Sequence, residues 1–136
     1  MRIVVTGGRD YSDYRTMDEM LSFAHQRWII DVLIEGEAPG LDTMARRWAT
    51  VRSIKVEPYP ADWNRYGDAA GSIRNGQMLR EGKPDLGIAF KGGVGTANMR
   101  RRCYRRRLPM VDVELLGIAA AKQRLILLGD QIKDPF

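Results

Sequence analysis

The chain has almost no residues that form covalent or metal cross-links. Among its 136 residues there is one cysteine, Cys103, and one histidine, His25. A single cysteine excludes an internal disulfide and is typical of a reducing cytoplasm, which is the location we expect. One cysteine and one histidine are too few for a Cys/His zinc site. We therefore predict no metal and no organic cofactor, and we interpret Cys103 as a structural residue on a helix.

Long apolar runs are also missing. No segment is long enough and apolar enough to span a membrane, so we expect no membrane association. The first residues, 1–6, run directly into a strand pattern, and we expect no signal peptide. A length of 136 residues with 44% hydrophobic and 29% charged residues fits one globular domain with a single core.

Acidic residues are in deficit. The 22 lysines and arginines exceed the 17 aspartates and glutamates, which leaves a formal net charge of +5 at pH 7. A basic balance of this kind favours anionic partners. We therefore looked for sites that bind nucleotides, phosphate groups or nucleic acid.

Strand and helix patterns alternate along the whole chain. Short apolar runs predict strands over 2–6, 31–35, 54–60, 85–89 and 108–113, and amphipathic segments predict helices over 14–28, 41–51, 69–81, 99–107 and 115–128. This order, with short connections, predicts an α/β fold: a Rossmann-like three-layer sandwich of about five parallel strands with helices on both faces. We expect residues 1–113 to form the core and 114–136 a C-terminal helix and a loose tail (129–136) packed on the same domain.

The most informative stretch is 90–98, with the sequence FKGGVGTAN. Three glycines and a threonine stand where a strand gives way to a helix. The first amides of a helix lack intrahelical partners and carry partial positive charge, and glycines let a phosphate approach them closely. Thr96 either caps the helix or donates its hydroxyl to a phosphate oxygen. Taken alone, such a turn is also compatible with a connection that binds nothing.

Three further strand-exit loops carry polar residues or glycines: 7–10, 36–40 and 61–67. The carboxyl ends of parallel strands share one edge, so these loops converge on the glycine turn. Arg9 is suited to clamp a phosphate and Asp10 to hold a ribose hydroxyl, unless the two pair with each other. Asp42 either caps its helix or contacts the ligand. Trp63 either stacks on a base or packs its loop.

Four blocks of the chain resemble the SLOG superfamily, whose Rossmann-like domain binds nucleotides and related molecules. The blocks are 5–11 (VTGGRDY), 36–45 (GEAPGLDTMA), 59–63 with 70–75 (YPADW and AGSIRN), and 90–96 (FKGGVGT). The resemblance is closest to the small bacterial and phage branch related to the YspA and YpsA type. It implies a nucleotide-binding or nucleotide-sensing domain, commonly one that forms a homodimer or higher homo-oligomer.

The lonely-guy branch of the same superfamily implies an enzymatic alternative. Those enzymes hydrolyse the N-glycosidic bond of nucleoside 5′-monophosphates with the signature Pro-Gly-Gly-x-Gly-Thr-x-x-Glu and an upstream arginine, which Arg74 resembles. Here Lys91 replaces the proline and Met99 replaces the catalytic glutamate. A thioether supplies neither charge nor a proton. A phosphoribohydrolase would therefore need another carboxylate, for which Asp10, Asp42 and Asp62 are the candidates.

A second alternative comes from the DNA-processing protein of natural transformation, which binds single-stranded DNA. Its Gly-x-Ala-x-Gly-x-Asp and Arg-Asn segments resemble residues 36–42 and 74–75. A basic run could then follow a phosphate backbone, although most such runs are solvated helix faces. Its members are Arg100, Arg101, Arg102, Arg105, Arg106 and Arg107.

We rank nucleotide binding first. Backbone amides of the glycine turn would cradle the phosphate, two arginines would neutralise it, and Asn75 would orient it. The predicted ligand-binding residues are Gly8, Arg9, Asp10, Gly40, Asp42, Asp62, Trp63, Arg74, Asn75, Gly92, Gly93, Gly95 and Thr96.

Overall fold

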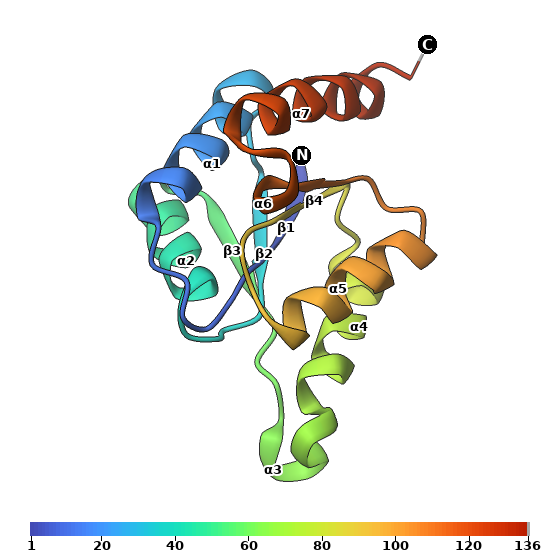
Figure 1. Ribbon diagram of the computed structural model, residues 1–136. Coiled ribbons are helices and arrows are strands. Elements are labelled where there is room, and N and C mark those ends of the chain that lie inside the picture. Colours follow the sequence, from blue (N-terminus) through green and yellow to red (C-terminus); the bar gives the residue numbers. More distant parts are fainter. Residues whose placement is uncertain (136) are drawn as a thin grey trace.

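A computed structural model describes residues 1–135 of the chain (Figure 1). The strands are β1 (Arg2–Thr6), β2 (Val32–Glu35), β3 (Lys55–Pro58), β4 (Leu86–Ala89) and β5 (Met110–Asp112). The helices are α1 (Tyr14–Trp28), α2 (Leu41–Val51), α3 (Trp63–Tyr66), α4 (Ala70–Gly82), α5 (Val94–Arg105), α6 (Val113–Leu116) and α7 (Ile118–Lys133), with a 3-10 turn over Gly67–Ala69.

The five strands form one parallel sheet in the order β3-β2-β1-β4-β5. The register places Val4 opposite Ile34 on one side and Thr6 opposite Ala89 on the other. The fully buried strands have apolar side chains on both faces, as expected when helices cover both. The predicted fold class is confirmed.

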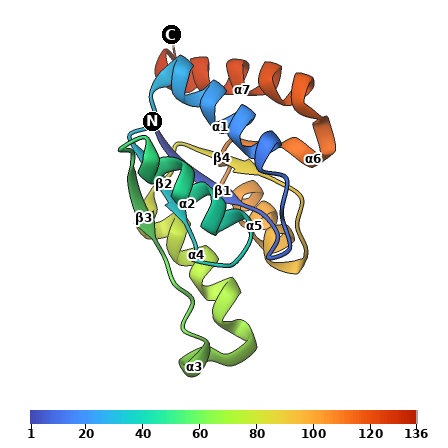
Figure 2. The same ribbon diagram turned by 90° about the vertical axis from the view of Figure 1, so that its left-hand side faces the viewer.

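Helices cover the two faces unequally. One cluster of buried side chains joins α1, α2 and α7 to the sheet, and a smaller cluster joins α4 and α5 to the opposite face. Figures 1 and 2 show the resulting three layers, with the helical segment α3 and the start of α4 projecting beyond them. Cys103 is buried in the smaller cluster, and burial raises its pKa to about 12.

The predicted C-terminal region differs from the observed one. A single helix over 115–128 was expected, but the chain forms α6, breaks at Gly117 with a φ of 79°, and continues as α7 to Lys133. Gly129, predicted as the start of a loose tail, is buried in α7, and a Cβ there would lie 2.6 Å from Trp28 Cε2. Phe136, the last residue of the predicted tail, lies outside the described residues.

Two shorter differences concern helix starts. The loop predicted over 61–67 contains α3, whose first turn is capped by Asp62 accepting from the Arg65 amide at 3.1 Å. Helix α5 begins at Val94 rather than at Met99, so the glycine turn forms its first turn. At the start of α1, Asp13 is the capping residue. None of the helices within residues 1–135 is long and apolar enough to cross a membrane.

Candidate functional site

The candidate site lies at the carboxyl edge of the sheet, where β1 and β4 are neighbours. The connection after β1 leads to one face of the sheet and the connection after β4 to the other, and this is the place where open parallel sheets bind ligands. The Gly8 amide donates to the Lys91 carbonyl at 2.8 Å, which ties the two exit loops together. A cleft of about 1070 Å³ opens above them.

The cleft brings together most of the predicted ligand-binding residues, whose roles in binding stay predictions. Its walls come from the exit loops of β1, β2, β4 and β5, from the first turns of α1 and α5, and from the middle of α4. The predicted residues that line it are Gly8, Arg9, Asp10, Asp42, Arg74, Asn75, Gly92, Gly93, Gly95 and Thr96.

The first turn of α5 faces this cleft. Its N-cap is Gly93, which makes no side-chain capping bond. Within residues 1–135, no acceptor is found for the amides of Val94, Gly95 and Thr96. These amides therefore carry the partial positive charge of a helix N-terminus without a protein partner, an arrangement suited to an anion.

The glycines of this turn have two different physical roles. A Cβ at Gly92 would overlap Thr96 Oγ1 and lie 2.8 Å from the Gly8 amide nitrogen, so only glycine fits there. A Cβ at Gly93 or Gly95 would meet nothing within 4 Å. Packing therefore does not require glycine at 93 and 95, and the space above them is open to the cleft.

Arg74, which belongs to α4, lines the wall of the cleft opposite the glycine turn. It donates through Nη1 to the Gly36 carbonyl and through Nε to Asn75 Oδ1 at 3.1 Å. Burial, and secondarily the nearby Arg9, lower its pKa, whereas Asp42 raises it. Because the ordinary pKa of arginine lies far above neutral pH, the guanidinium supplies positive charge to the cleft.

Asn75 is buried and engaged by the protein at both ends of its amide. Its Nδ2 donates to the Gly95 carbonyl and to Asn98 Oδ1, both at 3.1 Å, and its Oδ1 accepts from Arg74. The side chain thus fastens α4 to the first turn of α5. Its position indicates that Asn75 holds the glycine turn in place, and contact with a ligand would require it to give up one of these bonds.

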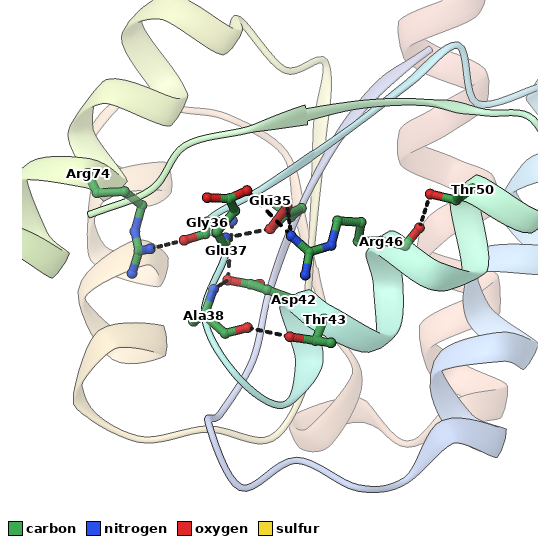
Figure 3. Close-up of polar contacts among 9 residues, drawn as sticks. All are labelled: Glu35, Gly36, Glu37, Ala38, Asp42, Thr43, Arg46, Thr50 and Arg74. Atoms are coloured by element: carbon green, nitrogen blue, oxygen red, sulfur yellow. Dashed lines mark hydrogen bonds and ion pairs between the residues drawn. The ribbon is translucent and has the colours of Figure 1, made fainter. Parts of the chain in front are cut away.

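Asp42 fixes the loop after β2 (Figure 3). Its Oδ2 accepts from the amides of Gly36 and Ala38, both at 3.2 Å. The carboxylate is buried, and burial raises its pKa against the lowering effect of these bonds and of Arg74. Asp42 therefore organises the loop that supports Arg74, while also lining the cleft.

Glu35, at the end of β2, was not among the predicted residues. Its side chain is fully buried, its Oε2 accepts from the Glu37 amide, and Arg46 Nη1 lies 4.0 Å from Oε1 (Figure 3). Oε1 has no hydrogen-bond partner within residues 1–135. Burial, with a further contribution from Asp42, raises the pKa of Glu35 to about 7. A glutamate ending an apolar strand was the only sequence signal for it.

Three predicted residues lie outside the lining of the cleft. Gly40, with a φ of 78°, packs against the β1 loop, where a Cβ would lie 2.5 Å from the Arg9 carbonyl oxygen. Asp62 caps α3. Trp63 lies under Arg9, whose guanidinium carbon is 5.2 Å from the ring centroid. Gly40 and Trp63 thus contact residues of the cleft rather than its open space.

Sequence reasoning also missed residues that the fold brings to the cleft. Lys91 is exposed in the glycine turn and adds a positive charge. Tyr11 packs edge-on against Phe90 at 5.7 Å, and burial raises its pKa to about 12. Asp13 and Glu114 contribute carboxylates at the α1 and α6 side. Lys91 was identifiable from its place in the glycine motif, whereas Glu114 depended on the fold.

Met99 does not reach the cleft. It is fully buried in the cluster that includes Val4, Met78 and Cys103 between α5 and the sheet. The position that holds a glutamate in the lonely-guy signature therefore belongs to the hydrophobic core here. Among residues 1–135, no group of three or more His, Cys, Asp or Glu side chains is placed to hold a metal ion.

Two comparisons with known proteins identify the family of this chain. The profile of the YspA, cpYpsA-related SLOG family (YAcAr) matches residues 1–66, which include β1, the β2 loop and α3. The chain is also similar to the Gene 61 protein of Mycobacterium phage D29, with 32% identity over 119 residues that cover 82% of this chain and 94% of that protein. On these grounds the chain belongs to the YspA, cpYpsA-related SLOG family.

Proposed function

We propose that the cleft binds a nucleotide or a nucleotide-derived small molecule through its phosphate. One observation carries the proposal. The amides of the α5 first turn, which have no acceptor within residues 1–135, open into a cleft at the junction of β1 and β4, beside the positive charges of Arg9, Arg74 and Lys91. A volume of about 1070 Å³ is large enough for a whole nucleotide rather than for phosphate alone.

The proposal assigns a role in binding to the groups that face the open space of the cleft. The amides of Val94, Gly95 and Thr96 bind phosphate oxygens, and the open space at Gly93 receives the phosphate. Arg9, which lies over Trp63, and Lys91 neutralise its charge. Asp10 is exposed in the cleft and is suited to accept from a ribose hydroxyl.

Calorimetry with nucleoside phosphates, cyclic nucleotides and ADP-ribose derivatives tests this proposal, with Gly93→Asp as the decisive variant. A side chain at 93 meets no protein atom within 4 Å, so the variant should fold. Its carboxylate occupies the phosphate position and repels the ligand, and we expect affinity to fall at least about 100-fold. Gly93→Ala is the uncharged control. The cradle assignment fails if no compound binds or if Gly93→Asp binds normally.

Hydrolysis of the N-glycosidic bond of nucleoside monophosphates is a second candidate, favoured by Asp42. Its carboxyl lines the cleft beside Arg74, and its raised pKa suits a general acid more than that of an exposed aspartate would. Chromatography of the four nucleoside monophosphates after long incubation tests it. Release of free base that is abolished by Asp42→Asn supports the enzyme, and absence of release leaves a binding protein.

Self-association is a separate proposal. Leu115 and Leu127 are 80% and 64% exposed. A partner copy covering these side chains would remove apolar surface from water. Light scattering at micromolar concentration should show a dimer or a higher oligomer, and a monomer at that concentration would contradict the proposal.

A further inference from the structure

The excess positive charge of the chain is concentrated in one segment. Residues 100–124 hold eight of the 22 basic side chains and only two of the 17 acidic ones. Fourteen basic and fifteen acidic residues remain elsewhere, so the rest of the chain is close to neutral. A charge that is unevenly placed in this way produces a local field rather than a uniformly basic surface.

The structure divides the basic run of α5 into two groups. Arg102 turns toward α4, where it donates to Asn98 Oδ1 at 3.1 Å and to Ser72 Oγ at 3.0 Å. Arg100 forms an ion pair with Asp112 at 2.8 Å. In contrast, Arg101, Arg105, Arg106 and Arg107 are exposed and have no ion pair within residues 1–135. These four retain a charge that the described part of the protein does not neutralise, and all but Arg106 line a groove beside α5.

These arginines meet a further one across a shallow groove. Helices α5 and α7 both contact β5, the edge strand of the sheet, and a groove of about 780 Å³ lies between them. Arg124 from α7 lines it, together with Arg100, Arg101, Arg105 and Arg107. Asp112 brings an acidic side chain into the same lining, but it is already paired with Arg100.

Two residues of the groove, Tyr104 and Arg107, bear on what it binds; Arg107 closes the end of α5, where the Leu108 amide donates to the Cys103 carbonyl at 2.9 Å. Tyr104 is 85% exposed, which leaves its ring free to stack. Arg107 has a φ of 56°, a conformation that glycine adopts without strain at the end of a helix. The chain thus carries an arginine beside the groove at a backbone position where its side chain is disfavoured.

We propose that this groove binds single-stranded nucleic acid, with its arginines on successive phosphates and Tyr104 stacked on a base. Arg101 and Arg105 are one helical turn apart. Their guanidinium groups can therefore contact successive phosphates along one nucleic-acid strand rather than a single phosphate. A concave surface with planar guanidinium groups and a free aromatic ring favours unstacked bases over a duplex or a lipid surface. The groove is distinct from the glycine cleft, and this inference does not depend on the proposed nucleotide site.

Fluorescence anisotropy with a labelled oligothymidylate of about 12 nucleotides at several salt concentrations tests the proposal. We expect affinity to fall steeply with salt. Arg105→Glu with Arg124→Glu should weaken binding at least about tenfold and reduce the salt slope by about 0.7 for each phosphate that is no longer neutralised. The matched control is Arg47→Glu with Arg80→Glu, which changes the charge equally at two exposed arginines elsewhere. The control should lower affinity much less.

Two further variants distinguish base stacking from charge neutralisation, and a role in binding from a role in stability. Tyr104→Ala should weaken binding about fivefold or more with an unchanged salt slope, because stacking releases no counterions. Arg107→Gly should raise the melting temperature and yet weaken binding, which a purely structural role would not produce. No binding at low salt, an equal decrease in affinity for the control pair, or binding to anionic vesicles but not to the oligonucleotide would each overturn the proposal.

Discussion

Asn75 on α4 donates a hydrogen bond of 3.1 Å to the carbonyl of Gly95, in the first turn of α5. These residues are 20 positions apart and belong to two helices that cover the same face of the sheet. The bond matters because it fixes the carbonyl of a turn whose amides face the cleft. The geometry of the candidate phosphate site is therefore controlled from a neighbouring helix.

Asn75→Ala should lower both stability and ligand affinity. The variant removes the hydrogen bonds from Asn75 to the Gly95 carbonyl and to Asn98 Oδ1, which keeps its bond from Arg102, and this costs about 1–3 kcal/mol of unfolding free energy. Urea denaturation and calorimetry measure the two effects. Gln77→Ala is the control on the same helix, because Gln77 donates to Glu81 at the exposed surface. Equal behaviour of the two variants would contradict the positioning role.

Met99→Glu should destabilise the protein without creating a hydrolase. The glutamate would enter the cluster of apolar side chains beside Cys103, at a cost of about 3–5 kcal/mol near neutral pH. The cost should shrink at acid pH as the carboxyl protonates. Met99→Leu, which conserves volume, should cost less than about 1.5 kcal/mol. A stable Met99→Glu variant that released free base would contradict the buried placement.

Glu35 should make stability decrease between pH 5 and pH 8. Its folded pKa of about 7 lies above the ordinary 4.5, so the folded state binds this proton more tightly than the unfolded state does. The stabilising contribution is complete below the ordinary pKa of 4.5 and is lost as the pH rises through about 7. At about 1.36 kcal/mol per pKa unit, the decrease is at most about 3 kcal/mol.

Glu35→Gln tests this pH dependence by urea denaturation at pH 5, 6, 7 and 8. Glutamine keeps an oxygen for the Glu37 amide and has no proton to lose, so the variant should have a flatter stability profile and gain most at pH 8. Asp42, whose pKa is also raised, interacts with Glu35, so the difference between the two profiles reports the titration of Glu35 together with its coupling to Asp42. Parallel profiles would show that Glu35 does not titrate in this range.

Gly129→Ala should destabilise the C-terminal helix despite the better helix propensity of alanine. Alanine gains about 1 kcal/mol in propensity, but its Cβ would lie 2.6 Å from Trp28 Cε2, and overpacking costs about 1–3 kcal/mol. Thermal unfolding followed by tryptophan fluorescence measures the balance. Ala119→Gly, at an exposed position of α7, gives the propensity effect alone. A higher melting temperature for Gly129→Ala would contradict the close packing.

The sequence by itself determined the fold class and the place where ligands are expected. Alternating strands and helices with short connections leave a parallel sheet as the compact solution, and such a sheet collects its exit loops at one edge. The position of the turn over 92–96 was readable for this reason, because glycines between a strand and a helix have a local physical meaning. The four motif blocks indicated the family because each consists of neighbouring residues, which can be read without knowledge of the fold.

Only the tertiary structure decided which side chains those loops share and which way each one faces. Asn75 and Arg102 are polar residues on predicted helices, and only the packing of α4 on α5 turned both toward protein acceptors. Glu35 continues an apolar strand in the sequence, yet the fold buries one of its oxygens without a partner among residues 1–135. Arg124 joins the α5 arginines because two distant helices border the same edge strand. Burial and pairing depend on contacts between segments that are far apart in the sequence, so no local pattern specifies them.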